Sequence, residues 1–483
     1  MAGKVDQPNV LNTKKTNFAE WYIQVVRAAG VVDQRYPIKG CDVLMPLGAS
    51  ALKKMTGFLE EKLRGIGNKE VLFPLFIPNS YFSKESRHIK GFEEEVYHIT
   101  HAGANKLDER LIVRPTSETG MYPMFSLWIR SYKDLPLKVF QTVSVFRYET
   151  KMTKPLIRTR EVSFFNESHT AHRSWKDAEE EIKKAIKVYS DYFSNDLCLP
   201  FIMLKRPESD KFPGAVYSLA FDVIMPDGKD LQIGTVHNLG DNFAKAFEIK
   251  CTDDNGKEVF VNQTCYGISA RSLGAVIGIH GDDKGLVFPP SIAPIKVVVI
   301  PIPVGDEKDV VMHEAEQVYA RLRKEFGQDV HFDDRDQSVG SKFYDWELKG
   351  VPVRVELGPK DIAKHCVTLV RRDTGKKFVI SQNNFVEYVK ELLDRIQREM
   401  RKNAQKEHDK RIVFASSIEE IKNAVDNKKF ARFPWCGSLD CAAEIEKTVN
   451  TPFIGYEEGA LEHKKCIDCG SEAKHMAYIG RKY

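Results

Sequence analysis

The sequence predicts a multidomain protein of the mixed α/β class, and three observations lead to this prediction. The chain has 483 residues, which is too long for a single hydrophobic core and suits about three domains. Short apolar runs typical of strands alternate with apolar stripes at helical spacing. Two close pairs of cysteines lie in a short segment of their own near the end of the chain.

Composition narrows the class of protein further. Hydrophobic residues make up 42% and charged residues 29%, as in an ordinary globular protein, and the net charge of +4 is compatible with nucleic-acid contact without being evidence for it. No apolar run approaches the roughly 20 residues of a membrane span, and the first residues lack the apolar core of a signal peptide. The 9 cysteines are scattered, unlike a disulfide scaffold. We therefore expect a cytoplasmic protein without membrane contact.

The first elements are two helices and a strand. Apolar spacing predicts an amphipathic helix over 16–29 and a second one over 52–63, which Gly65 and Gly67 end. The segment 71–76 then reads as a strand that contains Pro74. Because proline removes a ladder donor, this strand is expected at a sheet edge or at an interface with another chain.

Segments 92–99 and 111–113 are predicted as strands, and the second opens into Arg-Pro-Thr-Ser-Glu-Thr over 114–119. Pro115 suits the start of a helix, and Ser117 and Glu118 suit its first turn, so capping is one interpretation. A threonine hydroxyl beside a glutamate carboxylate also forms an acceptor-rich cup for an ammonium group. Both interpretations are open on these residues alone.

A charged hairpin follows. The β-branched strand 139–145 ends at Arg147, Pro155 interrupts the loop, and a second strand is predicted to begin at 158–161, Arg-Thr-Arg-Glu. Guanidinium groups bind phosphate in a planar fork and stay protonated, so this hairpin is suited to a polyanion. The alternative is a salt-bridged surface hairpin.

Beyond it we expect a core helix over 178–193 and strands over 231–240 and 263–271. Arg271 then opens an apolar helix, which places a cation near a helix N-terminus and indicates a phosphate site. A new unit begins near Pro294, with alternating strands and helices typical of a small mixed α/β domain. Its expected elements are strands 297–300, 353–357, 366–370 and 377–380 and helices 311–326 and 385–396, with a charged helical connector over 395–411.

Four cysteines in the final segment have the spacing of a metal site. Two close pairs of thiolates fit tetrahedral Zn²⁺, and a small appendage needs such a clip to fold. The alternative is four unligated thiols after metal loss. The pairs are Cys436 with Cys441 and Cys466 with Cys469. The other cysteines have apolar neighbours and are expected in the core: Cys41, Cys198, Cys251, Cys265 and Cys366.

Several of these segments together resemble a known family. The order F-R-x-E, a loop, R-x-R-E and then H-T-A-H at 169–172 resembles motif 2 of class II aminoacyl-tRNA synthetases, and the H-T-A-H ending is similar to prolyl-tRNA synthetases in particular. The helix, strand and proline before Ile77 resemble motif 1, the dimer element. The strand and helix around Arg271 resemble motif 3. The segment 234–243 is similar to the family's G-T-S-H-x-L-G-Q-N-F, with Val236 and Asp241 as departures.

The resemblance implies roles for particular residues. In motif 2, the arginine binds the α-phosphate and the amino-acid carboxylate, the glutamate orients adenine or the amino group, and the loop touches the tRNA acceptor end. The implied catalytic residues are Arg147 and Arg271. The implied proline-binding residues are Thr116, Glu118, Arg147, Phe165, Glu167, His169, Phe212 and Ser269. The implied ATP-binding residues are Arg147, Glu149, Arg158, Glu161, Thr235, His237 and Arg271. Phe165 stands where relatives often carry tryptophan, which leaves the pocket apolar but alters its shape.

Other segments extend the resemblance. The run 333–362 resembles the class II anticodon-binding domain, in which Glu347 and Lys376 are expected to read anticodon guanines. Five further side chains are expected to offer cations and a ring to splayed bases: Lys342, Trp346, Arg354, Arg371 and Arg372. Tyr483 resembles a C-terminal tyrosine that returns its carboxylate towards the active site; a frayed tail is the alternative. About 100 residues separate motifs 2 and 3, too few for an inserted editing domain, as in the archaeal and eukaryotic-like branch.

The implied architecture is an antiparallel-sheet catalytic domain over 1–290, a mixed α/β anticodon-binding domain over 291–402 and a small zinc-binding domain over 403–483. The implied activity is activation of L-proline by ATP with Mg²⁺, followed by transfer to tRNA(Pro), in a homodimer joined through motif 1, with structural Zn²⁺. Two alternatives are a class II synthetase for another amino acid and a non-catalytic, synthetase-like tRNA-binding protein.

Overall fold

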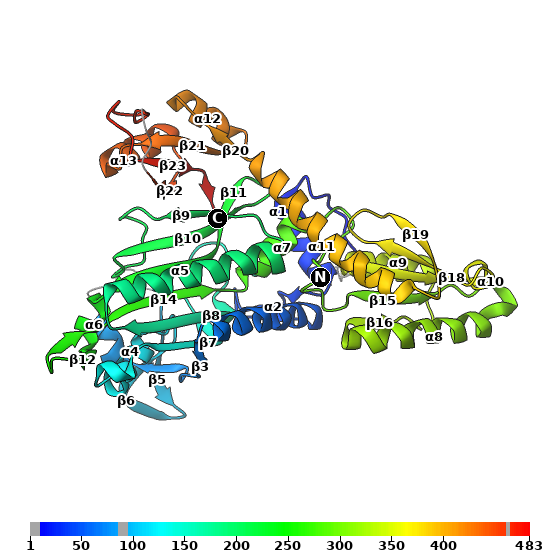
Figure 1. Ribbon diagram of the computed structural model, residues 1–483, viewed down its shortest axis with the longest axis horizontal. Helices are drawn as coiled ribbons and strands as arrows, with labels where there is room; N and C mark the ends of the chain where they lie inside the picture. Colours follow the sequence, from blue (N-terminus) through cyan, green and yellow to red (C-terminus); the bar gives the residue numbers. More distant parts are fainter. Residues whose placement is uncertain (1–9, 86–94, 460–463) are drawn as a thin grey trace.

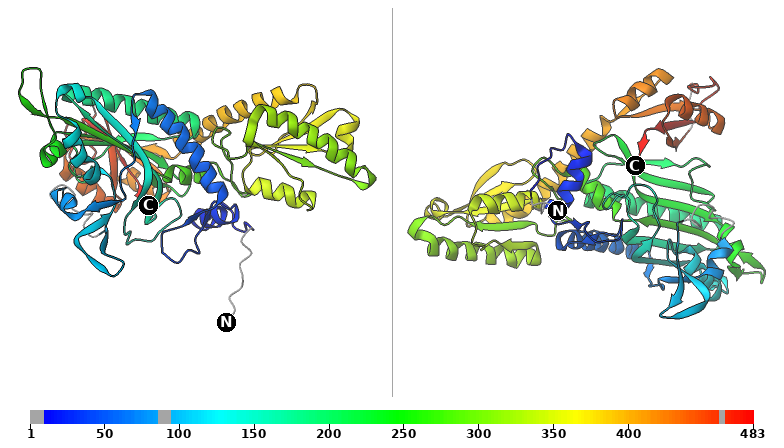
Figure 2. Two further views of the ribbon diagram at one scale, coloured as in Figure 1. Left: turned by 90° about the horizontal axis from the view of Figure 1, so that it is seen from below. Right: turned by 180° about the vertical axis from the view of Figure 1, so that it is seen from behind.

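The structure is a computed structural model that describes residues 10–85, 95–459 and 464–483 (Figure 1). A central body carries the largest sheet, and a second body of the α/β type stands at the right of Figure 1. A third, smaller body lies above the central sheet, and the long helix α11 (Phe385–Asp409) connects the second body to it. Figure 2 shows the same arrangement from two further sides.

The central sheet has 12 strands in the order β20-β21-β23-β22-β9-β10-β11-β14-β8-β7-β3, with β24 beside β11. Most neighbouring strands are antiparallel, and the pairs β3–β7, β20–β21 and β11–β24 are parallel. The strands are β3 (Lys69–Glu70), β7 (Leu137–Phe146), β8 (Glu161–His172), β9 (Ile202–Lys205), β10 (Tyr217–Ile224), β11 (Lys229–Gly240), β14 (Asn262–Ile268), β20 (Ile412–Phe414), β21 (Phe430–Trp435), β22 (Phe453–Glu458), β23 (His475–Ile479) and β24 (Arg481–Lys482).

Helices with apolar stripes cover one face of this sheet. They are α1 (Phe18–Ala28), α2 (Pro46–Gly65), α5 (Trp175–Asp191) and α7 (Arg271–His280). Their buried side chains, such as Trp21, Leu59 and Tyr189, form one core with Val236 and Tyr266 of the sheet. The stripe of α5 continues into a π-helical turn over Tyr192–Asp196. The predicted helices at 16–29, 52–63 and 178–193 are therefore confirmed as core elements.

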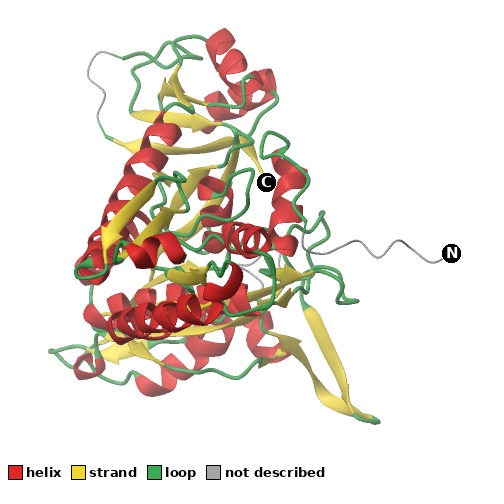
Figure 3. Ribbon diagram, turned by 90° about the vertical axis from the view of Figure 1, so that its right-hand side faces the viewer, coloured by secondary structure: helices red, strands yellow, loops and turns green. Residues whose placement is uncertain are grey.

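Smaller elements complete the central body: β1 and β2 pack with α1 and α2, whereas α4 and α6 pack on the opposite face of the sheet. The hairpin β5–β6 projects from the central body (Figures 1 and 3), and the described part of this hairpin pairs with β4. The elements are β1 (Val32–Asp33), β2 (Val43–Leu44), β4 (Phe76–Pro78), α3 (Asn79–Glu85), β5 (Tyr97–Ala102), β6 (Asn105–Val113), α4 (Glu118–Trp128), α6 (Asn242–Phe247), β12 (Lys250–Thr252) and β13 (Glu258–Phe260).

Several expected boundaries differ from the structure, and β6 for example begins six residues before the expected 111. The segment 71–75 is not a strand, because after Val71 it leaves the sheet and Phe73 N bonds to the side chain of Gln141 at 3.0 Å. The second arm of the charged hairpin begins at Glu161 rather than Arg158, since Arg160 N instead bonds to Gly40 O at 2.7 Å. The expected strand over 92–99 begins at Tyr97, and positions 92–94 lie outside the described residues.

The second body is a five-stranded mixed sheet in the order β16-β15-β17-β18-β19, with helices on both sides. This confirms the mixed α/β unit that the sequence predicts after Pro294. Its elements are β15 (Val297–Pro301), α8 (Lys308–Phe326), β16 (Val330–Phe332), α9 (Val339–Leu348), β17 (Val353–Leu357), α10 (Pro359–Ala363), β18 (Cys366–Arg371) and β19 (Lys377–Ser381).

The sequence predicts the final segment as a small appendage, but its strands continue the central sheet. Helices α12 (Ile418–Asp426) and α13 (Leu439–Val449) pack on strands that continue the central sheet. The junction is made where Tyr456 of β22 pairs with Lys205 of β9, and a second link joins β24 to β11. Among the described helices, none combines the length and apolar character needed to cross a membrane.

Candidate active site

The floor of the site is a row of side chains across four strands of the central sheet. Register pairs Ser218 with His237, His237 with Cys265 and Cys265 with His169, on strands β10, β11, β14 and β8. Directly paired residues of antiparallel strands point to the same face. This face lies opposite the core helices, because Val236 and Tyr266, one position along each strand, are buried in the core beneath them.

A cavity of about 540 Å³ opens above this floor. It brings together most of the predicted site residues, from segments far apart in the sequence. Those that line it are Thr116, Glu118, Arg147, Phe165, Glu167, His169, Phe212, Thr235, His237, Ser269 and Arg271. Arg158 instead lines an adjoining cavity of about 180 Å³ together with Arg271 and Tyr483. Glu149 and Glu161 line neither cavity.

One end of the cavity is rich in buried acceptors. The hydroxyl of Thr116 donates to the Glu118 carboxylate, and Ser117 donates to Glu167. Gln141 Nε2 lies 2.7 Å from Ser117 Oγ and 3.1 Å from Glu167 Oε1, and so fixes both groups. The Ser117 side chain makes no capping bond to α4, although the sequence allowed that role. The segment 116–118 thus forms a cup of oxygen acceptors suited to an ammonium group.

Charge at this end is set by two neighbours on β8. His169 Nε2 lies 3.5 Å from Glu167 Oε2. Burial raises the pKa of Glu167, but its interactions with His169, Ser117 and Gln141 more than reverse this effect, so its pKa lies below the usual value. Burial lowers the pKa of His169, and Glu167 together with Glu118 raises it above its usual value. The Glu167 carboxylate therefore stays ionised although it is buried, which favours a cationic ligand.

Aromatic rings form a wall beside this cup. Phe165 and Phe212 both line the cavity, as expected. The Phe212 ring lies against the imidazole of His237, with centroids 4.9 Å apart. His237 Nδ1 is 2.7 Å from Ser218 Oγ, and burial together with the nearby His169 lowers the pKa of His237 to about 3. His237 is thus a neutral group that contacts Phe212, although the family resemblance places the two at different ends of the cavity.

The end of the cavity that meets the adjoining one is lined by Arg271, and Arg147 lies between Arg271 and the carboxylates of the cup. Arg147 Nε donates to Pro115 O at 3.0 Å, and Arg271 Nε donates to Ile157 O at 2.8 Å. Burial lowers the pKa of Arg271 to about 10, helped by the charges of Arg147 and Arg158. Three guanidinium groups thus converge where solvent is scarce, and Arg158 has Glu149 within 3.6 Å. Such a group of buried positive charges is suited to a polyanionic ligand.

Tyr483 is packed at the edge of the arginine end. Its main-chain oxygen accepts a hydrogen bond from Arg158, and its hydroxyl donates to Asp227 Oδ1 at 2.8 Å. Its ring lies under the ammonium groups of Lys154 at 4.7 Å and Lys229 at 5.3 Å. Lys154 belongs to the loop of the charged hairpin. The chain end is therefore held against this loop instead of being frayed.

Two buried residues of the site were missed by the sequence analysis. Gln141 interrupts an apolar strand with an amide, and this polar residue was the available signal. Arg206 lines both cavities and donates to Asp222 Oδ1 at 2.6 Å and to Gln232 Oε1 at 3.0 Å. Arg206 directly follows the short strand 202–205. An arginine after apolar residues is not recognised as a buried site residue until its partner carboxylate is known.

The residues expected to contact the anticodon are placed differently from one another. Lys376 is exposed in the turn between β18 and β19. The Glu347 carboxylate lies 3.5 Å from Arg354 and 3.6 Å from Lys284. The five side chains expected to contact splayed bases are buried and bonded to protein groups, so their contact with bases stays a prediction: Lys342, Trp346, Arg354, Arg371 and Arg372.

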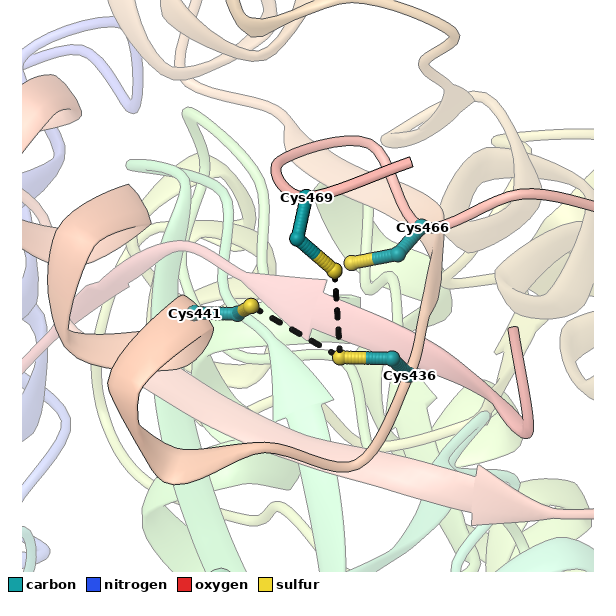
Figure 4. A group of neighbouring side chains, drawn as sticks. All are labelled: Cys436, Cys441, Cys466 and Cys469. Carbon is teal, nitrogen blue, oxygen red and sulfur yellow. Dashed lines mark hydrogen bonds between the residues drawn. The ribbon is translucent and has the colours of Figure 1, made fainter. Parts of the chain in front are cut away.

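The four cysteines of the final segment converge, as Figure 4 shows. Cys436 Sγ is 3.6 Å from Cys441 Sγ and 3.8 Å from Cys469 Sγ, and Cys466 completes a group whose sulfurs all lie within 4.8 Å of one another. Sulfurs around tetrahedral Zn²⁺ at about 2.3 Å are about 3.8 Å apart. The donor set and spacing therefore fit this ion. Among the other cysteines, Cys41 is half-exposed and was wrongly expected in the core, whereas the remaining four are buried.

The fold and the site together define a class II aminoacyl-tRNA synthetase. Residues 97–280 match the tRNA synthetase class II core domain (G, H, P, S and T), residues 296–392 match the anticodon binding domain, and residues 418–483 match the C-terminal domain of prolyl-tRNA synthetase. The chain belongs to the prolyl-tRNA synthetase family, as the resemblance had indicated.

Named relatives match this chain over nearly its whole length and support this assignment. The proline–tRNA ligase of Thermococcus kodakarensis is 48% identical over 473 residues, covering 97% of this chain and 98% of the relative. The proline–tRNA ligase of Methanopyrus kandleri is 45% identical over 483 residues, covering 100% and 99%. The solved structure of Giardia lamblia prolyl-tRNA synthetase in complex with prolyl-adenylate superposes with a TM-score of 0.95 at 38% identity, covering 98% of this chain and 99% of that one.

Proposed function

We propose that the protein activates L-proline with ATP to form prolyl-adenylate and then transfers the prolyl group to the 3′ end of tRNA(Pro). The observation that carries this proposal is the polarity of a single cavity. Buried carboxylates form an acceptor-rich cup in it, and the guanidinium groups of Arg147 and Arg271 line it as well, with Arg158 in the adjoining cavity. An amino acid and a nucleoside triphosphate have the matching charges.

The acceptor end would bind proline. Thr116 and Glu118 accept from its secondary ammonium group, while Glu167, fixed by Ser117 and Gln141, adds negative charge to the cup. Phe165 and Phe212 enclose the ring, and His169 and Ser269 complete the lining. His237 is proposed to lie at the border between the proline and nucleotide parts because its ring contacts Phe212.

The arginine end would bind ATP. Arg147 would hold the α-phosphate and the proline carboxylate, Arg271 the γ-phosphate, and Glu149, Arg158, Glu161 and Thr235 the remainder of the nucleotide. Mg²⁺ would enter with the triphosphate, because it prefers oxygen ligands. The carboxylates of Glu149 and Glu161 would offer further oxygens to the ion. Bound there, it would neutralise part of the phosphate charge.

Catalysis would then depend on positioning and charge. A carboxylate oxygen of proline attacks the α-phosphorus, a new C–O–P linkage forms, the bond to the β-phosphate oxygen breaks, and pyrophosphate leaves. Arg147 and Arg271 fix the two reactants in line and stabilise charge on the transferring group. None of these steps requires a covalent intermediate with a side chain.

Other parts of the chain would support this reaction. The second body, over 291–402, would bind the anticodon through Glu347 and Lys376. The third body, over 403–483, would hold structural Zn²⁺ through Cys436, Cys441, Cys466 and Cys469, while 1–290 would form the catalytic domain. The cytoplasm, where tRNA is charged, is the proposed location.

A homodimer is proposed through α2 and the segment after it. Leu72 and Phe76 are 75% and 49% exposed, which is unusual for apolar side chains next to a sheet edge. A groove of about 490 Å³ lies between α2 and the β7–β8 hairpin, lined by Lys53, Glu60 and Phe164 among others. An apolar edge beside such a groove is suited to a second copy of the chain.

Proline-dependent exchange of labelled pyrophosphate into ATP tests the activity. Exchange that requires proline, followed by esterification of tRNA(Pro), is expected. Exchange that depends on another amino acid would support a class II synthetase for that amino acid. Absence of exchange with every amino acid would support a non-catalytic tRNA-binding protein.

A further inference from the structure

Three side chains of different chemistry meet at the floor of the cavity. The carboxylate of Glu118, the imidazole of His169 and the thiol of Cys265 place one ligand atom each within 4.8 Å of the others. They come from α4, β8 and β14, and His169 and Cys265 are register partners on adjacent strands. All three are deeply buried, with exposed fractions of 3%, 1% and 5%. Cys265 has no role in the proposed reaction.

The imidazole of His169 is arranged as metal-binding histidines are. Its Nδ1 lies 3.1 Å from the hydroxyl of Tyr122, which fixes the ring. Its Nε2 is buried and makes no hydrogen bond within the described structure, with Glu167 Oε2 at the ion-pair distance of 3.5 Å. Histidine ligands in proteins generally bind the metal through one nitrogen while the other is held by a hydrogen bond.

The donor set selects the kind of ion. One carboxylate, one imidazole and one thiolate are ligands of Zn²⁺, and three protein ligands leave a position open. Ligands around this ion at about 2.0–2.3 Å are about 3.3–3.8 Å apart, so side-chain shifts of about 1 Å would bring the three atoms from within 4.8 Å into contact with one ion. Binding would release to solvent any proton carried by His169 or Cys265.

We propose that Glu118, His169 and Cys265 form an inhibitory site for Zn²⁺ within the amino-acid cup. The ion would occupy the place that the ammonium group of proline takes, and both cannot bind Glu118 at once. The competition with proline rests on the proposed function, whereas binding of the ion to this trio does not. The site is distinct from the four-cysteine group, which lies in the third body.

Direct binding can be measured with Co²⁺ as the probe. Protein whose four-cysteine group is already loaded with Zn²⁺ is expected to take up one further Co²⁺ per chain, with an absorption band from thiolate bound to cobalt. Cys265→Ser should weaken this binding by at least about 10-fold, since it removes a ligand outright. Cys251→Ser is the matched control, because Cys251 is buried in the same apolar cluster but does not line the cavity.

Kinetics then test the competition. Added Zn²⁺ is expected to raise the apparent KM for proline in pyrophosphate exchange without changing the KM for ATP. Each variant is compared with its own rate without added metal. Cobalt uptake that is unchanged in Cys265→Ser, or no uptake beyond the four-cysteine group, would overturn the site. If proline failed as a substrate, the cobalt result would still decide the site independently of the proposed function.

Discussion

Arg372 and Asp282 form a bidentate ion pair between the central body and the second body. Arg372 Nη1 and Nη2 donate to Asp282 Oδ2 and Oδ1 at 2.7 and 2.6 Å, and Arg372 Nε donates to Glu347 O at 2.7 Å. Asp282 follows α7, the helix that begins at Arg271. The ion pair therefore joins the second body, next to the proposed anticodon residue Glu347, to the segment that follows α7.

We predict that Arg372→Lys and Asp282→Asn interact non-additively. Each should lower the thermal midpoint, because lysine cannot replace the planar fork and asparagine removes the charge. The double variant should lose about 0.5–3 kcal/mol less than the sum of the single changes, as expected for residues in direct contact. Calorimetry of the four proteins is the measurement. Strict additivity would show that the pair contributes no coupling.

We predict that Arg271→Ala or Arg147→Ala abolishes adenylate formation while the protein stays folded. Loss of one group that stabilises transition-state charge costs about 100- to 1000-fold in rate. Pyrophosphate exchange and circular dichroism are the measurements. Arg173→Ala is the control, since Arg173 forms an exposed ion pair with Asp254, lies over the ring of Tyr132 and does not line the cavity, so the variant should leave exchange unchanged. Near-normal exchange in either test variant would refute the phosphate assignment.

We predict about one zinc per chain and its loss on Cys469→Ser. Cys469 is the exposed member of the four-cysteine group, so this substitution leaves the local core intact. Elemental analysis gives the metal content. We expect the variant to have a lower thermal midpoint but the same amino-acid specificity, because the cysteines lie outside the synthetase motifs. Cys41→Ser serves as the comparison and should retain the metal. Protein prepared without chelator that contained no zinc would contradict this prediction.

We predict that Asp42→Asn stabilises the protein above pH 6. Burial raises the pKa of Asp42 to about 6, compared with 3.8 when it is exposed. The unfolded chain therefore binds fewer protons than the folded one between these values, so stability falls as pH rises through them. Above pH 6 the variant should be more stable by about 1–2 kcal/mol, allowing for the partial exposure of the group. Below about pH 4 the thermal midpoints should coincide.

We predict that removal of Tyr483 impairs aminoacylation. The residue holds Arg158 and lies beneath Lys154, so its loss should loosen the hairpin loop. Asp227→Asn is a milder change that weakens the hydroxyl contact and removes a charge near Lys154 but keeps the Tyr483 ring and main-chain oxygen, so it should have a smaller effect. Steady-state aminoacylation and pyrophosphate exchange are compared in each protein. A truncated protein that works at full rate would show that the contact has no catalytic consequence.

Local sequence patterns predicted where several of the candidate site residues lie, whereas their proposed roles come from the family resemblance. Arg147 and Arg271 stand where a strand ends and a helix begins, and such positions can be predicted from periodicity and from residue type. The closeness of Thr116 and Glu118 was also predictable, because both side chains come from one short segment, but the residues alone did not decide between a cup and a helix cap.

Contacts that depend on strand order were not predictable in the same way. β8 pairs with β14 on one side, so His169 meets Cys265 across nearly a hundred intervening positions, about the separation of motifs 2 and 3. Arg206 needed Asp222 to explain it, and Trp346 is buried by its bond to Asp333. In each case the partner is chosen by tertiary packing, which local propensity does not encode.

The strand pairing between β9 and β22 has a consequence for folding during synthesis. On one side β9 has β10, and on the other it has only β22, which is made much later in synthesis. Until residues 453–458 arrive, the growing chain carries an open row of backbone donors and acceptors. Such edges recruit strands from other molecules. If the proposed zinc site is what holds this last segment in place, removal of the metal should leave β9 uncovered and promote aggregation of the protein.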